Sequence, residues 1–113
     1  MPGKSTLRSR AAVFKALGHP SRLFIVDELS RGERCVCELT AMVGADVSTV
    51  SKHLSVLKAC GLVDDERRGA KVFYRLRVPC VITSFSCIDA VLARRGSAGT
   101  AEPPQEPAEA AGG

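Results

Sequence analysis

Two cysteines separated by one residue carry the clearest chemistry in this sequence. Cys35 and Cys37 flank Val36 at the start of a segment that we expect to be helical. The dipole and unpaired N–H groups at a helix N-terminus favour the thiolate, the form of cysteine that binds soft metal ions. Residues i and i+2 of a regular helix point about 200° apart, so both sulfurs reach one ion only if Cys35 lies outside the helix or the first turn unwinds. The other interpretation is that two small cysteines simply pack a helix start.

The remaining cysteines are Cys60, Cys80 and Cys87, which brings the total to five, an odd number. An odd count is unlike a disulfide framework and leaves packing, metal binding or redox chemistry. Cys60 continues an apolar helical stripe and is interpreted as core. Cys80 and Cys87 are about 10 Å apart along one helix, too far to share an ion. A third ligand for an ion at the CxC pair would come from one of these three, solvent or a small thiol. We favour Cys87, for which core packing is an equal alternative.

The periodicity of apolar residues predicts the elements that position these cysteines. We expect helices over residues 7–17, 37–43, 47–60 and 79–95, and a further helix that begins at residue 20 and ends at residues 31–32. Expected strands cover residues 62–67 and 71–76. Asp46 suits the N-cap of the 47–60 helix, whose residues Val47, Val50, Leu54 and Leu57 form a buried stripe. The order α-α-α-α-β-β-α is mostly helical with a small β-hairpin, which describes a winged helix-turn-helix.

The outward face of the 47–60 helix is polar and basic. It carries Ser48, Thr49, Ser51, Lys52 and His53. Short hydroxyls and a cation can contact phosphates and base edges without blocking close approach of the helix. A basic hairpin tip follows, with Arg67, Arg68 and Lys71. Either feature alone is typical of a solvated surface; in this order they predict a DNA-contact surface. His19, before Pro20, is interpreted as a structural hydrogen-bonding residue.

The last part of the 113-residue chain differs in composition from the rest. Residues 96–113 have no Val, Ile, Leu or aromatic residue, so we expect a disordered acidic tail after a single domain over 1–95. The tail holds three glutamates, so the body has sixteen basic against nine acidic residues, a formal charge of +7 that weakly favours a polyanionic partner. A body this small would gain from dimerisation. Neither a membrane span nor a secretory signal is evident, which predicts a cytoplasmic protein.

Four segments resemble one known family. They are LGHPSR at 17–22, VSTVSKHL at 47–54, LKACGLV at 57–63 and GAKVFYRL at 69–76. In combination they resemble the ArsR/SmtB family of metal-responsive repressors over about residues 7–92. The resemblance implies a homodimer joined by its first and last helices, which binds operator DNA until an inducer releases it.

The cysteine pair also resembles a family feature. ERCVCEL at 33–39 is similar to the family's box for trivalent arsenic and cadmium, which implies As(III) or another soft ion as inducer and no constitutive cofactor. There are departures from the family patterns. Thr40 stands where one arsenic-sensing branch has a third cysteine, the N-terminus lacks the cysteines of the cadmium branch, and residues 80–95 hold no histidine for the zinc site of the last helix.

Three functions are weighed on these residues. The first is a repressor released by a soft metalloid or metal at Cys35 and Cys37. The second is a thiol-redox or persulfide sensor on the same fold, in which one of this pair bonds to Cys80 or Cys87. The third, a small thiol oxidoreductase or metal carrier, is disfavoured because the spacing is CxC rather than CxxC and no βαβ pattern occurs. We therefore expect a regulator and not an enzyme.

Overall fold

The computed structural model describes residues 3–95, and the predicted tail lies outside this range. The chain divides into two compact units, residues 1–79 and 80–113, which are described separately here. The prediction of one domain over 1–95 therefore stays a prediction. None of the helices described in residues 3–95 combines the length and the hydrophobicity that a membrane span requires.

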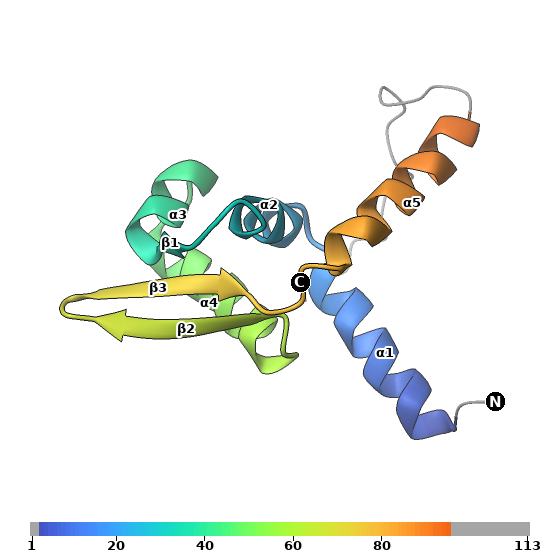
Figure 1. The fold of residues 1–113 in the computed structure, drawn as a ribbon, viewed down its shortest axis with the longest axis horizontal. Helices are drawn as coiled ribbons and strands as arrows, with labels where there is room; N and C mark the ends of the chain where they lie inside the picture. The colour runs from blue at the N-terminus through green and yellow to red at the C-terminus, as the bar shows by residue number, and fades with distance from the viewer. Residues whose placement is uncertain (1–2, 96–113) are drawn as a thin grey trace. The chain divides into compact units, whose positions relative to one another are not determined.

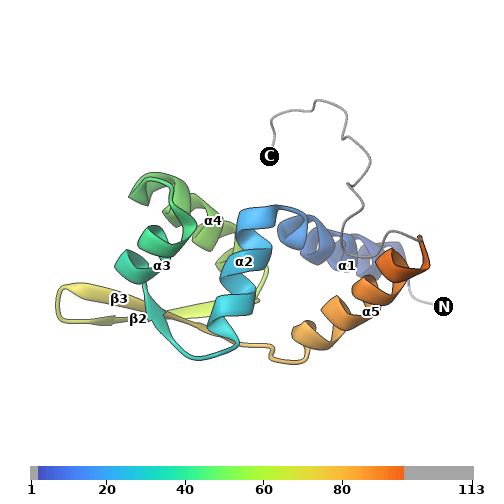
Figure 2. The same cartoon turned by 90° about the horizontal axis from the view of Figure 1, so that it is seen from above.

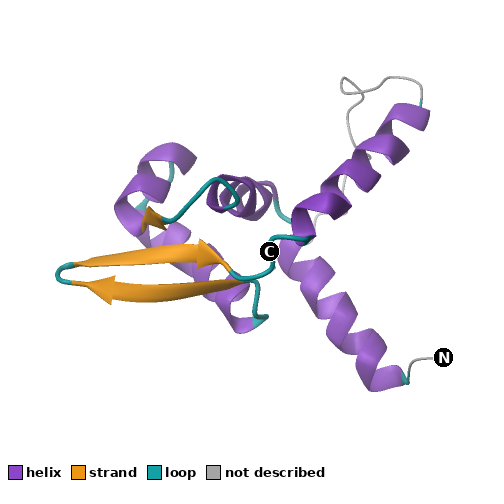
Figure 3. Cartoon of the chain, viewed as in Figure 1, coloured by secondary structure: helices purple, strands orange, loops and turns teal. Residues whose placement is uncertain are grey.

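The first unit holds four helices and three strands among its described residues (Figures 1 and 3). They are α1 (Lys4–Leu17), α2 (Pro20–Leu29), β1 (Arg34–Cys35), α3 (Val36–Val43), α4 (Val47–Ala59), β2 (Val63–Arg68) and β3 (Lys71–Leu76). The second unit holds α5 (Val81–Arg94). The mostly helical fold with a hairpin is confirmed, and the predicted element order is missing only the short strand β1.

A tight turn joins α3 to α4. Gly44 ends α3 in the left-handed conformation at φ 78°, where a side chain would strain the backbone. Asp46 then begins α4, because its carboxylate accepts the backbone N–H of Thr49 at 2.8 Å. These residues make the helix-turn-helix that the sequence predicts.

The core of the first unit lies where α2, α3 and α4 pack together beside the hairpin (Figure 2). Ile25, Leu39, Val50, Leu54 and Leu57 are each fully buried. The free energy gained by burying such apolar side chains is the main contribution that keeps these short helices packed together. Val47 was predicted to belong to this stripe, but it is the first residue of α4 and is 56% exposed.

The sheet is antiparallel in the order β1-β3-β2. In the hairpin, Arg68 pairs with Lys71 across a two-residue loop in which Gly69 has φ 64°. On the other side of β3, Cys35 pairs with Phe73. The two-residue strand β1 was not predicted, since a strand this short has no periodicity to detect. It ties the backbone at Cys35 directly to the hairpin of β2 and β3, residues 63–76, which is the wing of this fold.

The helix α5 begins two residues later than predicted, after the turn at Pro79 and Cys80. Val81, Phe85 and Leu92 of its predicted apolar face are half-buried, whereas Ile88 is 53% exposed. No residue of α5 is fully buried. The helix therefore carries apolar surface that its own unit leaves exposed.

Candidate functional site

The outward face of α4 is accessible from solvent. Ser48, Thr49, Ser51 and Lys52 are all exposed. The Ser48 hydroxyl donates to Asp46 at 3.1 Å, which orients it at the beginning of the helix. Hydrogen bonds from Thr49, and then from Ser48, lower the pKa of Asp46, so its carboxylate stays ionised at the helix N-terminus. The four predicted DNA-contact residues thus share one polar surface.

His53 lies differently from its four neighbours. Its ring is half-buried, its Nδ1 accepts the Nε–H of Arg22 at 3.3 Å, and it lies 4.5 Å from the ring of His19. His19 in turn caps α2, because its Nδ1 accepts the N–H of Ser21 at 3.0 Å. The sequence predicted a structural role for His19 but a DNA-backbone contact for His53. The His53 ring instead joins α4 to α2, and its contact with DNA stays a prediction.

Arg22 is the buried member of this cluster, with 7% of its surface exposed. Besides His53 it binds the Ala16 carbonyl, to which its Nη1 donates at 3.1 Å. One guanidinium therefore connects the end of α1, the body of α2 and the middle of α4. The contact between Arg22 and His53 joins residues 31 positions apart in the sequence, and no local sequence pattern indicates it.

The cluster predicts a pH dependence of stability. Burial, and then the charges of His19 and Arg22, lower the pKa of His53 below its ordinary value. The unfolded chain therefore binds the His53 proton more readily, and stability is lost as pH falls below about 6.5. We expect the free energy of unfolding in urea to drop more between pH 7.5 and 5.5 for the native chain than for His53→Gln. Parallel pH profiles at matched protein concentration would contradict this assignment.

The three basic residues of the wing are not equivalent. Arg68 binds Glu33 at 2.9 Å and Glu66 at 2.8 Å, and its guanidinium lies 4.7 Å from the centre of the Phe73 ring. Arg67 and Lys71 are exposed and form no ion pair with the described residues. The charge of Arg68 is therefore already matched by two carboxylates, whereas the other two cations are available to phosphates.

This difference predicts unequal salt effects. Arg67→Ala and Lys71→Ala should each reduce the slope of log K against log salt by about 0.9, the release expected for one phosphate contact. Arg68→Ala should change the slope by less than half as much. Fluorescence anisotropy of a labelled duplex between 50 and 300 mM salt, roughly the range in which such slopes are measured, gives the three values. Equal slopes for all three variants would show that DNA draws Arg68 away from its carboxylates.

The cysteine pair meets the geometric condition set by its spacing. Cys35 is the N-cap of α3, with extended backbone at ψ 163°, so it lies outside the helix. The structure joins the sulfurs of Cys35 and Cys37 in a disulfide, with their Cα atoms 5.4 Å apart. The Glu38 carboxylate accepts the N–H of Cys35 at 2.8 Å and holds this turn. The C-x-x-E spacing of Cys35 and Glu38 is a local signal from which this cap could have been predicted.

A pocket of about 340 Å³ adjoins the pair. Its walls include both cysteines, Val47 at the first position of α4, and the wing residues Ala70, Lys71 and Val72. The side chain of Cys37 is exposed, whereas Cys35 is 3% exposed. A group bound to the cysteines would therefore lie directly against two of the elements that are predicted to contact DNA.

The other three cysteines are free thiols in the structure. Cys60, predicted as core, is the half-buried C-cap of α4, and its thiol donates to the Leu57 carbonyl at 3.4 Å. Cys80 and Cys87 are exposed and belong to the second unit. Residues 3–95 hold no group of three or more His, Cys, Asp or Glu arranged for a metal ion. Cys87 as a third ligand stays a prediction, and the observed disulfide is within the CxC pair rather than to Cys80 or Cys87.

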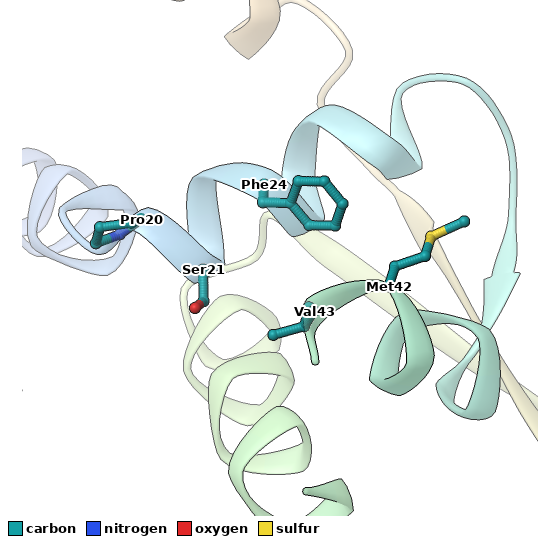
Figure 4. A pocket seen from close by; sticks show the side chains of 5 residues that line it. All are labelled: Pro20, Ser21, Phe24, Met42 and Val43. Atoms are coloured by element: carbon teal, nitrogen blue, oxygen red, sulfur yellow. The ribbon is translucent and has the colours of Figure 1, made fainter. Parts of the chain in front are cut away.

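A second pocket, of about 230 Å³, lies between α2 and α3 (Figure 4). Its lining is apolar except for Ser21, with Phe24 and Met42 facing one another across it. It has no charged side chain, cysteine or histidine, so it offers no chemistry comparable to that of the cysteine pair.

Known proteins share this architecture over most of the chain. The solution structure of a homodimeric winged helix-turn-helix DNA-binding domain from Mycobacterium bovis, a possible ArsR-family transcriptional regulator, is 30% identical with a TM-score of 0.71. The match covers 91% of this chain and all of that one. The model of the bacterial regulatory protein, arsR family, matches residues 19–65. This chain belongs to the ArsR family. The predicted family and winged helix-turn-helix fold are thereby confirmed.

Curated regulators are also similar to this ArsR-family chain in sequence. An uncharacterized HTH-type transcriptional regulator of Mycobacterium tuberculosis is 33% identical over 95 residues, which cover 83% of each chain. The HTH-type transcriptional repressor SmtB of the same species is 40% identical over 75 residues, 66% of this chain. Here the match spans 56% of the relative's length. These relatives are named as regulators and not as enzymes, in line with the expectation for this ArsR-family chain.

Proposed function

We propose that this ArsR-family chain is a transcriptional repressor that acts in the cytoplasm, binds double-stranded operator DNA as a homodimer, and is released by chemistry at Cys35 and Cys37. The observation that carries the proposal is the pocket in which the two sulfurs adjoin the first residue of α4 and the start of β3. An inducer there would contact the DNA-binding elements directly and shift the population toward a form that binds DNA poorly.

The DNA contact rests on surface and charge. The exposed polar face of α4 would enter the major groove, and Arg67 with Lys71 would bind flanking phosphates. The dimer rests on apolar surface that each unit leaves exposed: Leu7 and Phe14 of α1 are 51% and 68% exposed, and Ile88 and Val91 of α5 are 53% and 57% exposed. The homodimeric state of the M. bovis relative agrees with this use of the surface.

Trivalent arsenic is the first candidate for the inducer. Two convergent cysteine sulfurs are the donors that a thiophilic ion selects, and reduction of the disulfide would supply both. The pair fits such an ion as two of its ligands. A third would come from solvent, a small thiol or Cys87, because the described residues hold no complete set. The resemblance of residues 33–39 to the family's arsenic box favours arsenite over other soft ions.

Oxidation of the pair is the second candidate. The sulfurs of Cys35 and Cys37 are joined in the structure, so a disulfide fits the backbone as it stands. In this alternative the regulator responds to thiol oxidation or persulfide, and the CxC pair is itself the switch.

Fluorescence anisotropy of a labelled promoter duplex measures DNA binding. It tests both parts of the proposal, the binding of operator DNA and the release by an inducer. The reduced chain should bind with a salt-dependent affinity, and arsenite should weaken binding at least about tenfold, a coupling of ordinary size for effectors. An excess of a competing dithiol should restore binding. Failure to bind any promoter fragment would overturn the repressor proposal. Binding that neither arsenite, cadmium nor a thiol oxidant weakens would overturn sensing alone.

A further inference from the structure

The two cysteines of the pair differ sharply in accessibility. Cys35 is 3% exposed and is held by β1, whereas Cys37 is exposed on the first turn of α3 and opens to the pocket of about 340 Å³. A reagent from solvent therefore meets the sulfur of Cys37 first. Cys35 lies within bonding reach of that sulfur, as the disulfide shows.

Lys71 places a cation in the same pocket. It lines the pocket together with the cysteines, is exposed, and makes no ion pair with the described residues. The other named walls, Val47, Ala70 and Val72, are apolar. A lone cation among apolar walls attracts small anions and raises their local concentration.

From these contacts we propose that Cys37 and Lys71 form a capture site for small carboxylate-bearing disulfides, with Cys37 as the attacking thiol and Cys35 as the resolving thiol. The proposal deepens the oxidation alternative for the site and rests in that sense on the proposed function. It adds a substrate class and separate roles for the two cysteines.

The reaction proceeds in two exchange steps. The Cys37 thiolate attacks one sulfur of the small disulfide R–S–S–R, so a Cys37–S–S–R bond forms and R–S⁻ leaves. The Cys35 thiolate then attacks the Cys37 sulfur, and a second R–S⁻ leaves as the Cys35–Cys37 disulfide forms. In total the two thiols of the protein are oxidised by two electrons, and the small disulfide is reduced to two thiols.

Lys71 also links this chemistry to DNA. It is one of the two wing cations available to phosphates, and a carboxylate held on Cys37 would compete with DNA for it. While the mixed disulfide persists, the wing is expected to lose one phosphate contact. The slope of log K for DNA binding against log salt should then fall by about 0.9.

The test measures reaction rates without DNA, so its failure is distinguishable from failure of the repressor proposal. A reduced Cys35→Ser/Cys80→Ser/Cys87→Ser chain is treated with 3,3′-dithiodipropionate, a dianion, or with cystamine, a dication of similar size. Mass spectrometry follows the adduct, and peptide mapping separates Cys37 from Cys60. The anion-to-cation rate ratio should fall at least about threefold at low salt when Lys71→Gln is added, the modest end of electrostatic effects on encounter rates.

Two further variants serve as matched controls. Lys71→Arg keeps the charge and should keep the ratio. Lys4→Gln removes one exposed positive charge outside the pocket and should leave the ratio unchanged. Differences in intrinsic reactivity between the two disulfides cancel, because only the ratio is compared between variants. A ratio that Lys71→Gln does not change would overturn the role of Lys71.

The roles of the cysteines are read from the adduct itself. With Cys35 retained, the adduct on Cys37 should be transient, and two small thiols should be released for each protein disulfide formed. With Cys35→Ser, the adduct should accumulate. In a Cys37→Ser chain, Cys35 should react at least about tenfold more slowly, because access controls exchange rates. Equal reactivity of Cys35 and Cys37 would overturn the proposed order of attack.

Discussion

Replacing Arg22 with alanine should lower the free energy of unfolding by about 3 kcal/mol, the loss typical when a buried hydrogen-bonded charge is removed. The guanidinium is 7% exposed and donates to His53 Nδ1 and to the Ala16 carbonyl, so its removal leaves two acceptors without this donor. Because the contacts join α1, α2 and α4, DNA affinity should fall as well. Urea unfolding in reducing buffer, at one fixed protein concentration, measures the change.

Arg31→Ala is the matched control. Its side chain is 57% exposed and pairs on the surface with Asp27 and Glu28, so its removal should cost less than about 1 kcal/mol. Arg22→Lys keeps the charge but loses the planar set of guanidinium donors. Its loss of unfolding free energy should therefore lie between those of Arg22→Ala and Arg31→Ala. A native-like stability of Arg22→Ala would mean that the cluster does not hold the helices together.

Cys35→Ser and Cys37→Ser should each abolish release by arsenite while leaving operator affinity within about threefold of the native chain. Neither side chain belongs to the predicted DNA face, so binding survives. A ligand shifts the DNA-bound population only through its differential affinity for the two forms, and a serine hydroxyl does not replace a thiolate for a soft ion. Anisotropy titrations of the reduced variants with and without arsenite give both quantities.

Cys87→Ser discriminates between models of the site. Loss of release in this variant would place Cys87 among the ligands, whereas full release would leave the CxC pair with a ligand from solution. Cys60→Ala is the control, because its half-buried thiol bonds only locally to the Leu57 carbonyl. If arsenite still releases both CxC variants, the sensor assignment is wrong and the cysteines of α5 become the candidates.

Local signals in the sequence account for the parts of the fold that were predicted well. Asp46 and Gly44 set the turn between α3 and α4 through their own backbone and side-chain chemistry, and Leu54 and Leu57 repeat with the helical period. Such features depend on residues a few positions apart, which a single sequence displays. The hairpin itself was predicted from the same kind of local signal, but with Arg68 in its turn. In the structure Arg68 is the last residue of β2 and pairs with Lys71, so the loop has two residues rather than three.

The site was predicted less completely because it depends on contacts between distant segments. Nothing near His53 indicates that Arg22 lies 31 positions away at 3.3 Å, and nothing near Arg68 indicates Glu33. Periodicity alone also assigned Val47 to the core, although it is the first residue of α4 and is 56% exposed. The CxC pair was identified by its spacing, but its pocket arises from the wing, which β1 brings alongside.

The carboxylates that hold Arg68 have a consequence for the evolution and engineering of operator affinity. Glu33 and Glu66 act as counterions of Arg68. This cation is therefore held away from DNA, although a simple count of the basic residues in the wing would include it among the DNA contacts. Replacing both Glu33 and Glu66, neither of which belongs to the predicted DNA-contact residues, would free Arg68 and strengthen binding to every sequence alike. DNA affinity can thus be raised or lowered by changing the acidic residues that pair with wing cations, without altering the residues that are predicted to contact the bases.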